Sequence, residues 1–262
     1  MFQLLKVEWM KVKNYRAFWV LSVLYFISLF GANYISYQVY QTGPRNNDIA
    51  KGIIGKLFDF PDVWHTVSYT SSFLMFMLGL LIIISFTNEY SYKTHRQNII
   101  DGWSRKEFIG VKIALTIIVA LAATIAVFIT ALLFGLYENT ASFTFEKIEF
   151  IGYFFIQAVS YCSAALVFSL LFKRSGITIG VYFLYTLILE NMLAAFLNHY
   201  TDNIGRYLPL ETTDNLIRIP FGKGLINQFI ASYNTPALLI MTAVYLVLYY
   251  FISFKKFQSD DL

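Results

Sequence analysis

Six long runs of apolar residues limit what this chain can fold into more than any other feature of its sequence. Each run is close to the roughly 20 residues that a helix needs to cross the hydrocarbon core of a bilayer. The runs cover about residues 17–37, 69–86, 113–136, 148–172, 177–197 and 236–254. Because they are continuous rather than alternating, they predict membrane-spanning helices and not the strands of a membrane barrel.

The composition supports a protein that lies largely within a membrane. Hydrophobic residues make up 57% of the 262 residues and charged residues only 14%, whereas soluble domains carry about a quarter charged residues. We therefore expect an all-α, polytopic integral membrane protein in which residues 1–262 form a single transmembrane domain. The one cysteine, Cys162, lies inside an apolar run, so the chain has neither an intrachain disulfide nor a cysteine-based zinc site.

Lys and Arg are divided unequally between the two sets of loops, and this division predicts the orientation of the chain. Six spans place both termini on the same side. That side holds thirteen of the 20 basic residues, including every short basic cluster beside a span: Lys6, Lys11, Lys13, Arg16, Lys93, Arg96, Arg105, Lys106, Lys112, Lys173, Arg174, Lys255 and Lys256. Basic residues accumulate in cytoplasmic loops, so we expect both termini in the cytoplasm. Membrane orientation also accounts for the net charge of +4 without a nucleic-acid partner.

Residues 1–16 precede the first span and show the spacing of a short amphipathic helix. Phe2, Leu5, Trp9 and Val12 follow one another at intervals of three, four and three residues, which places them on one helical face. We expect an interfacial helix with Trp9 at the depth of the lipid headgroups. The alternative is an ordinary juxtamembrane segment. The apolar run that follows is too long for a signal peptide, so it is interpreted as an uncleaved span.

Motifs for nucleotide binding and for common catalytic centres are missing from the sequence. It contains no phosphate-binding loop, nucleophile elbow, zinc-protease motif or dinucleotide fingerprint. We expect no metal or cofactor on this chain, and any use of ATP must come from another chain. Glu190 is the charged residue inside a predicted span. Such a carboxylate is a candidate functional group, or it marks the outer interface where the helix ends.

A charged, amide-rich segment, residues 88–112, separates the second and third spans. It contains Glu89, Thr94, Arg96, Ile99, Gly102, Trp103, Ser104, Arg105 and Lys112. This order of an acidic residue, Thr-x-Arg, a small-residue turn with Ser-Arg and a following Lys resembles the permease subunits of type-2 ABC exporters, the ABC-2 class. The six spans, the amphipathic N-terminal helix and the Leu-Pro sequence between the last two spans are similar as well. Lys93 stands where many members of that class have Gly.

This resemblance implies that residues 88–112 form a coupling helix that docks on a separate cytoplasmic ABC ATPase. It implies two ATPase copies, which carry ATP and Mg, and a second permease that is the same chain or a paralogue. It also implies a multi-pass protein of a prokaryotic inner (plasma) membrane. In this hypothesis Glu89 orients the segment and meets basic groups on the ATPase. Arg96 and Arg105 pair with carboxylates, and Ile99 and Trp103 anchor the interface.

Other interpretations remain open at the level of sequence. Residues 88–112 can be a solvated loop whose basic residues only satisfy the orientation rule. The chain can also be an integral membrane enzyme that acts on lipid or peptide, which requires polar catalytic groups converging at one membrane depth, or a membrane scaffold or sensor that transports nothing. A co-purifying ATPase separates the transport hypothesis from the others. The transported substrate and the direction of transport are not set by these residues.

Overall fold

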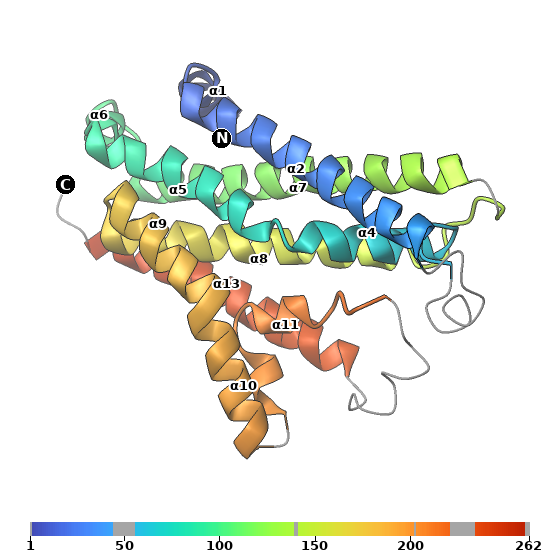
Figure 1. The fold of residues 1–262 in the computed structure, drawn as a ribbon. Helices are drawn as coiled ribbons and strands as arrows, with labels where there is room; N and C mark the ends of the chain where they lie inside the picture. Colours follow the sequence, from blue (N-terminus) through green and yellow to red (C-terminus); the bar gives the residue numbers. More distant parts are fainter. Residues whose placement is uncertain (1, 44–55, 139–140, 202, 221–233, 260–262) are drawn as a thin grey trace.

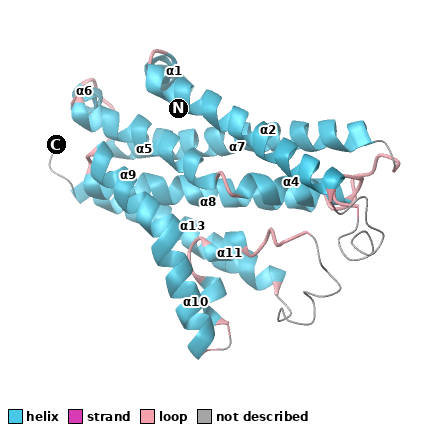
Figure 2. Ribbon diagram, viewed as in Figure 1, coloured by secondary structure: helices cyan, strands magenta, loops and turns pink. Residues whose placement is uncertain are grey.

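Helices account for all the regular structure in the computed structural model, which describes residues 2–43, 56–138, 141–201, 203–220 and 234–259 (Figure 2). The long helices are α2 (Arg16–Thr42), α5 (Met75–Ser91), α7 (Arg105–Glu138), α8 (Glu149–Phe172) and α13 (Thr235–Ser259). Shorter ones are α1 (Phe2–Lys13), α4 (Asp62–Ser72), α6 (Thr94–Ile100), α9 (Ser175–Leu184), the π-helix η2 (Tyr185–Leu189), α10 (Glu190–Tyr200), the 3₁₀-helix η3 (Ile204–Tyr207) and α11 (Glu211–Asp214).

Five helices in the described residues are long and apolar enough to cross a membrane, or six if the bent pair α4–α5 is one span. This confirms the predicted all-α, polytopic membrane fold. The central helix is α8, whose most apolar stretch is 78% buried, against 17% for α13 and 22% for the helix Ser175–Tyr200. The outer helices therefore turn large apolar surfaces toward lipid or another subunit.

The second predicted span differs from a simple helix over residues 69–86. It begins at Asp62, and α4 and α5 meet at an angle of 51°. The hydroxyl of Ser72 donates to the carbonyl oxygen of Tyr69, and the Leu74 N–H donates to the carbonyl oxygen of Ser71. Side-chain hydroxyls that bond to the preceding turn compete with the helical ladder, so the serines beside the break provide its physical cause.

The third span is also longer than predicted. The third span begins at Arg105 rather than at residue 113, because α7 continues beyond the apolar run. The described part of the stretch between α10 and α13 forms two short helices, η3 and α11, with Leu210 and Ile217 buried. Of the loop between α2 and α4, residues 44–55 lie outside the described residues.

One end of the bundle gathers elements that are far apart in the sequence. Figure 1 shows α1, α6 and the last turns of α13 at this end, while the loop that joins α7 to α8 lies at the other. The described parts of both termini therefore share an end with α6, as an even number of spans requires.

A close approach between α5 and α9 occurs at Gly79. A Cβ atom at this position would lie 2.1 Å from the Tyr182 hydroxyl oxygen, whereas one at Gly180 would meet nothing within 4 Å. We expect Gly79→Ala to lower the free energy of unfolding by about 1–3 kcal/mol through overpacking. Gly180→Ala should be neutral or stabilising by up to about 1 kcal/mol, because alanine favours the helix. Unfolding of both variants in detergent tests this, and equal stabilities would contradict the close packing.

Candidate functional site

The connecting segment, residues 88–112, consists of the end of α5, the short helix α6 and the start of α7. Two residues in the left-handed conformation flank α6: Lys93, with φ of 57°, and Gly102, with φ of 97°. Glycine adopts this conformation at little cost, whereas a residue with a Cβ atom is strained there. Glycine would therefore be less strained than lysine at position 93, and the two left-handed residues set α6 off as a separate helix between two reversals.

The start of α7 is fixed by a reciprocal cap. The backbone N–H and the hydroxyl of Ser104 donate to the Glu107 carboxylate at 2.9 and 2.7 Å, and the Glu107 N–H donates back to the Ser104 hydroxyl at 3.2 Å. This is a capping box, which satisfies backbone N–H groups that have no partner within the helix. The Ser-x-x-Glu spacing is visible in the sequence and indicates that α7 begins well before the apolar run.

A buried ionic network joins the connecting segment to the N-terminal helix. The Lys112 ammonium donates to the carboxylates of Glu8 and Glu89, and both residues are ion-paired to it. Lys11 adds contacts of 2.7 Å to Glu8 and 3.3 Å to Glu89. The side chains of Lys112, Glu8 and Glu89 are 2%, 2% and 7% exposed. The network thus ties α1, α5 and α7 together at one buried point.

The charges within this network balance one another. Two carboxylates face two ammonium groups, and the Lys112 Nζ also lies 5.2 Å and 5.9 Å from the ring centroids of Phe108 and Phe86, where the aromatic faces favour a cation. Burial raises the pKa of the Glu8 carboxyl, but the positive charges of Lys112 and Lys11 outweigh it and leave the pKa below its ordinary value. Glu8 is therefore ionised at neutral pH, and the stability that its lowered pKa contributes is lost as the pH falls from the ordinary pKa of a glutamate through this lowered value.

A second set of contacts links the connecting segment to the end of α13. The Arg105 guanidinium donates to the carbonyl oxygens of Phe257 and Gln258, where a helix has carbonyl groups without partners and favours a positive charge. The Phe108 and Phe257 rings stack with centroids 4.7 Å apart. These contacts attach the Arg105 guanidinium to the end of α13, and its expected pairing with a carboxylate of the ATPase stays a prediction.

A buried histidine, His95, holds the inner face of α6 against α5. The His95 ring bonds through Nδ1 to the Glu89 carbonyl oxygen at 3.1 Å and stacks on Tyr90 with ring centroids 4.4 Å apart. The Lys11 ammonium covers Trp103 at 5.7 Å from the ring centroid. Packed side chains therefore connect α6 to α5, and Trp103, which follows α6, to α1.

The exposed face of the connecting segment differs in part from the one expected. Arg96, Gly102 and Ser104 are exposed, and Thr94, Ile99, Trp103 and Arg105 are partly buried, while Glu89 and Lys112 are buried. The basic groups that Glu89 meets belong to its own chain. Ile99 and Trp103 pack against the core. On α6 itself the exposed large apolar side chain is Ile100, 77% exposed, one position further along the helix, and Tyr92 before α6 is 72% exposed.

Comparison with protein families supports the resemblance in the connecting segment. The family model described as ABC-2 family transporter protein matches residues 4–189, which include α1, α6, α7 and the whole ionic network. The chain belongs to this family. A comparison with curated proteins gave no match. The family identifies the chain as the permease subunit of an ABC transporter, a transport component that is not itself catalytic. In the ranges that the structure describes, no group of three or more His, Cys, Asp or Glu side chains is arranged to hold a metal ion.

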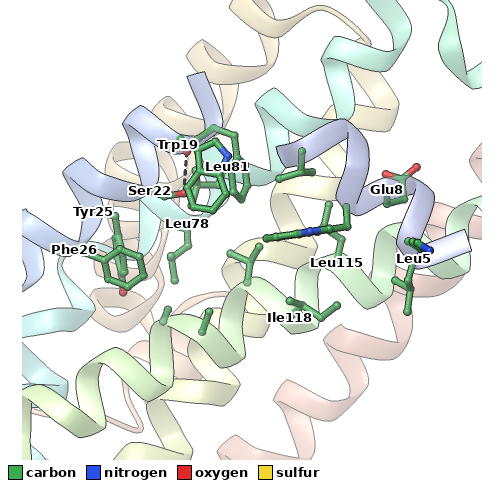
Figure 3. A pocket seen from close by; sticks show the side chains of 17 residues that line it. Leu5, Glu8, Trp19, Ser22, Tyr25, Phe26, Leu78, Leu81, Leu115 and Ile118 are labelled. Atoms are coloured by element: carbon green, nitrogen blue, oxygen red, sulfur yellow. Dashed lines mark hydrogen bonds between the residues drawn. The ribbon is translucent and has the colours of Figure 1, made fainter. Parts of the chain in front are cut away.

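The N-terminal helix of this ABC-2 permease lies over an apolar groove of about 790 Å³ between α1, α2, α5 and α7 (Figure 3). Figure 3 shows Trp19, Leu78 and Leu115 around this groove, with Glu8 beyond them on α1. Trp9 on α1, 53% exposed, meets Trp19 edge to face. The groove lies between α1 and the bundle, and the polar contacts of α1 include the ionic network at Glu8 and the Lys13 carbonyl oxygen, which accepts the Trp19 Nε1–H at 3.0 Å. The interfacial position of α1 in the membrane stays a prediction.

Glu190, the charged residue inside the fifth span, is buried at the start of α10 beside the π-helix η2. Its Oε1 accepts the backbone N–H groups of Leu210 and Glu211 at 2.6 and 3.2 Å. The carboxylate therefore holds α11 against the fifth span, a structural task that neither hypothesis for this residue included.

The two hydrogen bonds of Glu190 predict how substitutions behave. Glu190→Gln keeps an oxygen acceptor, so its effect on stability should be small. Glu190→Leu leaves both N–H groups without a partner, which should cost about 1–3 kcal/mol of unfolding free energy. Thermal unfolding of the two variants, with hydrogen exchange at the Leu210 amide, measures the difference. Full protection of that amide in Glu190→Leu would contradict the assigned role.

Proposed function

We propose that this permease works in an ATP-driven exporter and that its connecting segment docks on a separate cytoplasmic ATPase, which carries ATP and Mg. The observation that supports the proposal is that the two faces of α6 differ. Its outer face exposes Arg96 and Ile100, a charge beside an apolar anchor, while its inner face is fastened to the spans. Isolated apolar side chains at the centre of polar surfaces are typical anchors of protein interfaces.

The inner contacts of the connecting segment support a role in transmitting force. Lys112 joins the segment to α1 through Glu8, and Arg105 joins it to the end of α13. A displacement of α6 would therefore act on α1 and α13, two helices that are distant from it in sequence. In the proposed cycle, closure of the ATPases displaces α6 and shifts the permease between inward-open and outward-open states. In the alternative, residues 88–112 form a solvated loop whose basic residues only set the orientation in the membrane. That alternative gives no reason for the contacts of Lys112 with α1 and of Arg105 with α13.

The outer faces of the permease support assembly with a second one. Large apolar side chains are exposed along α9, α10 and α13, among them Phe183, Met192 and Phe251 at 46%, 66% and 60%. We propose a pair of permeases, identical or paralogous, bound to two ATPases, with the substrate path between the permeases. The basic residues of α1 and α6 support the placement of this end in the cytoplasm of a prokaryotic cell, with the protein in its inner membrane.

The test of this function is purification of the tagged permease from its native membranes. We expect a separate protein with a phosphate-binding loop to co-purify, and the complex in nanodiscs to hydrolyse ATP, which the permease alone should not do. Recovery of the folded permease without any ATPase, or catalysis by the isolated chain, would contradict the proposal. Vesicles that hold the complex then report the direction of transport.

A further inference from the structure

A pocket of about 270 Å³ lies at the α4–α5 break, away from the connecting segment. Its wall combines aromatic and polar side chains from four parts of the fold. The aromatic ones are Tyr69, Phe73 and Phe76 beside the break and Tyr161 on α8, and the polar ones include Gln157 on α8, Asn191 on α10 and Asp214 at the end of α11. The pocket extends beyond the family match, which ends at residue 189.

The polar groups of this pocket have more acceptors than donors. Gln157 donates through Nε2 to Asp214 at 2.8 Å, and the Tyr161 hydroxyl donates to the same carboxylate at 3.0 Å. The carboxylate thereby sets the orientation of the Gln157 amide, because the reversed amide would place two acceptors together. The Gln157 Oε1 is then left buried without a hydrogen-bond partner, in a residue that is only 2% exposed. Such an acceptor requires a donor from outside the chain.

The carboxylates around the pocket have no cationic partner in the part of the chain that the structure describes. Among the described residues, none of the ion pairs involves Asp214, Glu190 or Glu211. The titratable groups that face Asp214 are Glu211 on its own helix, Glu190 on α10, and Tyr161 and Tyr182 on α8 and α9, and none of them is a cation. Asp214 lies deep in the protein and keeps accessible surface where it meets the pocket. A carboxylate in such a place favours a positively charged ligand.

We propose that this pocket binds the ammonium group of an organic amine, with the Asp214 carboxylate and the Gln157 amide oxygen as acceptors. Asn191 donates its own N–H to the carbonyl oxygens of Thr186 and Leu187, so its amide oxygen is a further acceptor on the wall. The rings of Tyr69 and Phe73, edge to face at 5.3 Å, provide faces of the kind that attract ammonium groups. A divalent metal ion fits less well, because hard cations take six or more oxygen ligands and the pocket offers one carboxylate.

The ammonium ligand and Asp214 must carry opposite charges, which predicts how binding depends on pH. Burial raises the pKa of Asp214 to about 7, and the charges of Glu211 and Glu190 act in the same direction. Asp214 is therefore largely protonated below this value and ionised above it. Binding of an amine should be strong at pH 8.5, where the amine itself is still protonated, and should weaken as the pH falls through 7.

Calorimetric titration of the full-length permease in nanodiscs tests the proposal without any ATPase, so its outcome is independent of the coupling hypothesis. The probes are methylammonium, benzylamine and phenethylamine at pH 8.5 and pH 6, with 2-phenylethanol as the neutral match and empty nanodiscs as the baseline. We expect at least one amine to bind saturably at pH 8.5, more weakly at pH 6, and the alcohol not to bind.

Variants identify the site. Asp214→Asn and Gln157→Met should each weaken amine binding by about tenfold or more, the loss expected for one charge-assisted hydrogen bond. Glu146→Gln, which neutralises an exposed carboxylate between α7 and α8, should bind as the unchanged chain does. Thermal unfolding confirms that each variant is folded. The proposal is overturned if no amine binds the folded permease, in which case water satisfies the free acceptor, or if folded Asp214→Asn keeps full affinity.

Discussion

Replacement of Lys112 by methionine should lower the free energy of unfolding by about 3 kcal/mol, the range measured when one partner of a buried ion pair is removed. The substitution leaves the buried carboxylates of Glu8 and Glu89 with Lys11 as their remaining cation, and Lys11 is 28% exposed. A midpoint from reversible unfolding in mixed detergent micelles measures the loss. The expected consequence is detachment of α1 from the bundle, seen as increased protease access to residues 2–13.

The matched control for Lys112→Met is Lys106→Met on the first turn of the same helix, where the side chain is exposed. That change should stay within about 0.5 kcal/mol of the original stability. Adding Glu8→Gln and Glu89→Gln to Lys112→Met removes the uncompensated charges and should recover much of the loss, because neutral replacement of a whole buried ionic group is tolerated. Equal stabilities of Lys112→Met and Lys106→Met would show that the network does not hold α1.

Substitution of Ile100 by aspartate should weaken binding of the ATPase by about 2 kcal/mol or more, the loss typical of a central interface anchor. This corresponds to roughly 30-fold in Kd. Ile100 is 77% exposed, so the spans should keep their stability. Arg96→Glu should act in the same direction, because it reverses an exposed charge on α6 that we expect to face carboxylates of the partner. ATP-dependent transport and ATPase binding are measured on the same preparations.

The control for Arg96→Glu is Glu146→Lys, which reverses an exposed charge in the loop that joins α7 to α8. Figure 1 shows this loop at the other end of the bundle from α6. Glu146→Lys should change neither ATPase binding nor transport. A loss of transport with unchanged ATPase binding in Ile100→Asp would place the defect after docking. Unchanged binding and unchanged transport in both α6 variants would exclude α6 as the docking element.

The spans and the connecting segment could be predicted because both depend on local composition. Continuous apolar runs can satisfy backbone hydrogen bonds in lipid only as helices, and residues 88–112 interrupt two such runs. The pairing of Glu8 with Lys112 could not be predicted, since it joins residues 104 positions apart. In the sequence Lys112 is one of several basic residues beside a span. Glu8 lies in the amphipathic N-terminal segment, and nothing in the sequence indicates which residue it pairs with.

Other differences have local causes that composition does not reveal. The rotation of α6 decides whether Ile99 or Ile100 faces outward, and a helix of only seven residues contains too little pattern to fix that rotation. The break between α4 and α5 falls at Phe73 and Leu74, so it is not caused by the proline or glycine that usually marks a kink. The serines directly before the break are the feature of the sequence that indicates it. Asp214 lies in a stretch between spans, and its environment depends on Gln157 and Tyr161 of α8.

Docking of an ATPase on α6 is the central claim, and site-specific photo-crosslinking tests it most directly. A photoreactive residue replaces Ile100 in one preparation and Phe143, exposed in the loop between α7 and α8, in another. Each complex is irradiated after co-purification, and the products are identified by mass spectrometry. The account predicts a permease–ATPase adduct from position 100 and none from position 143. Co-purification of the ATPase without an adduct at position 100 would contradict it, because the ATPase would then bind elsewhere on the permease.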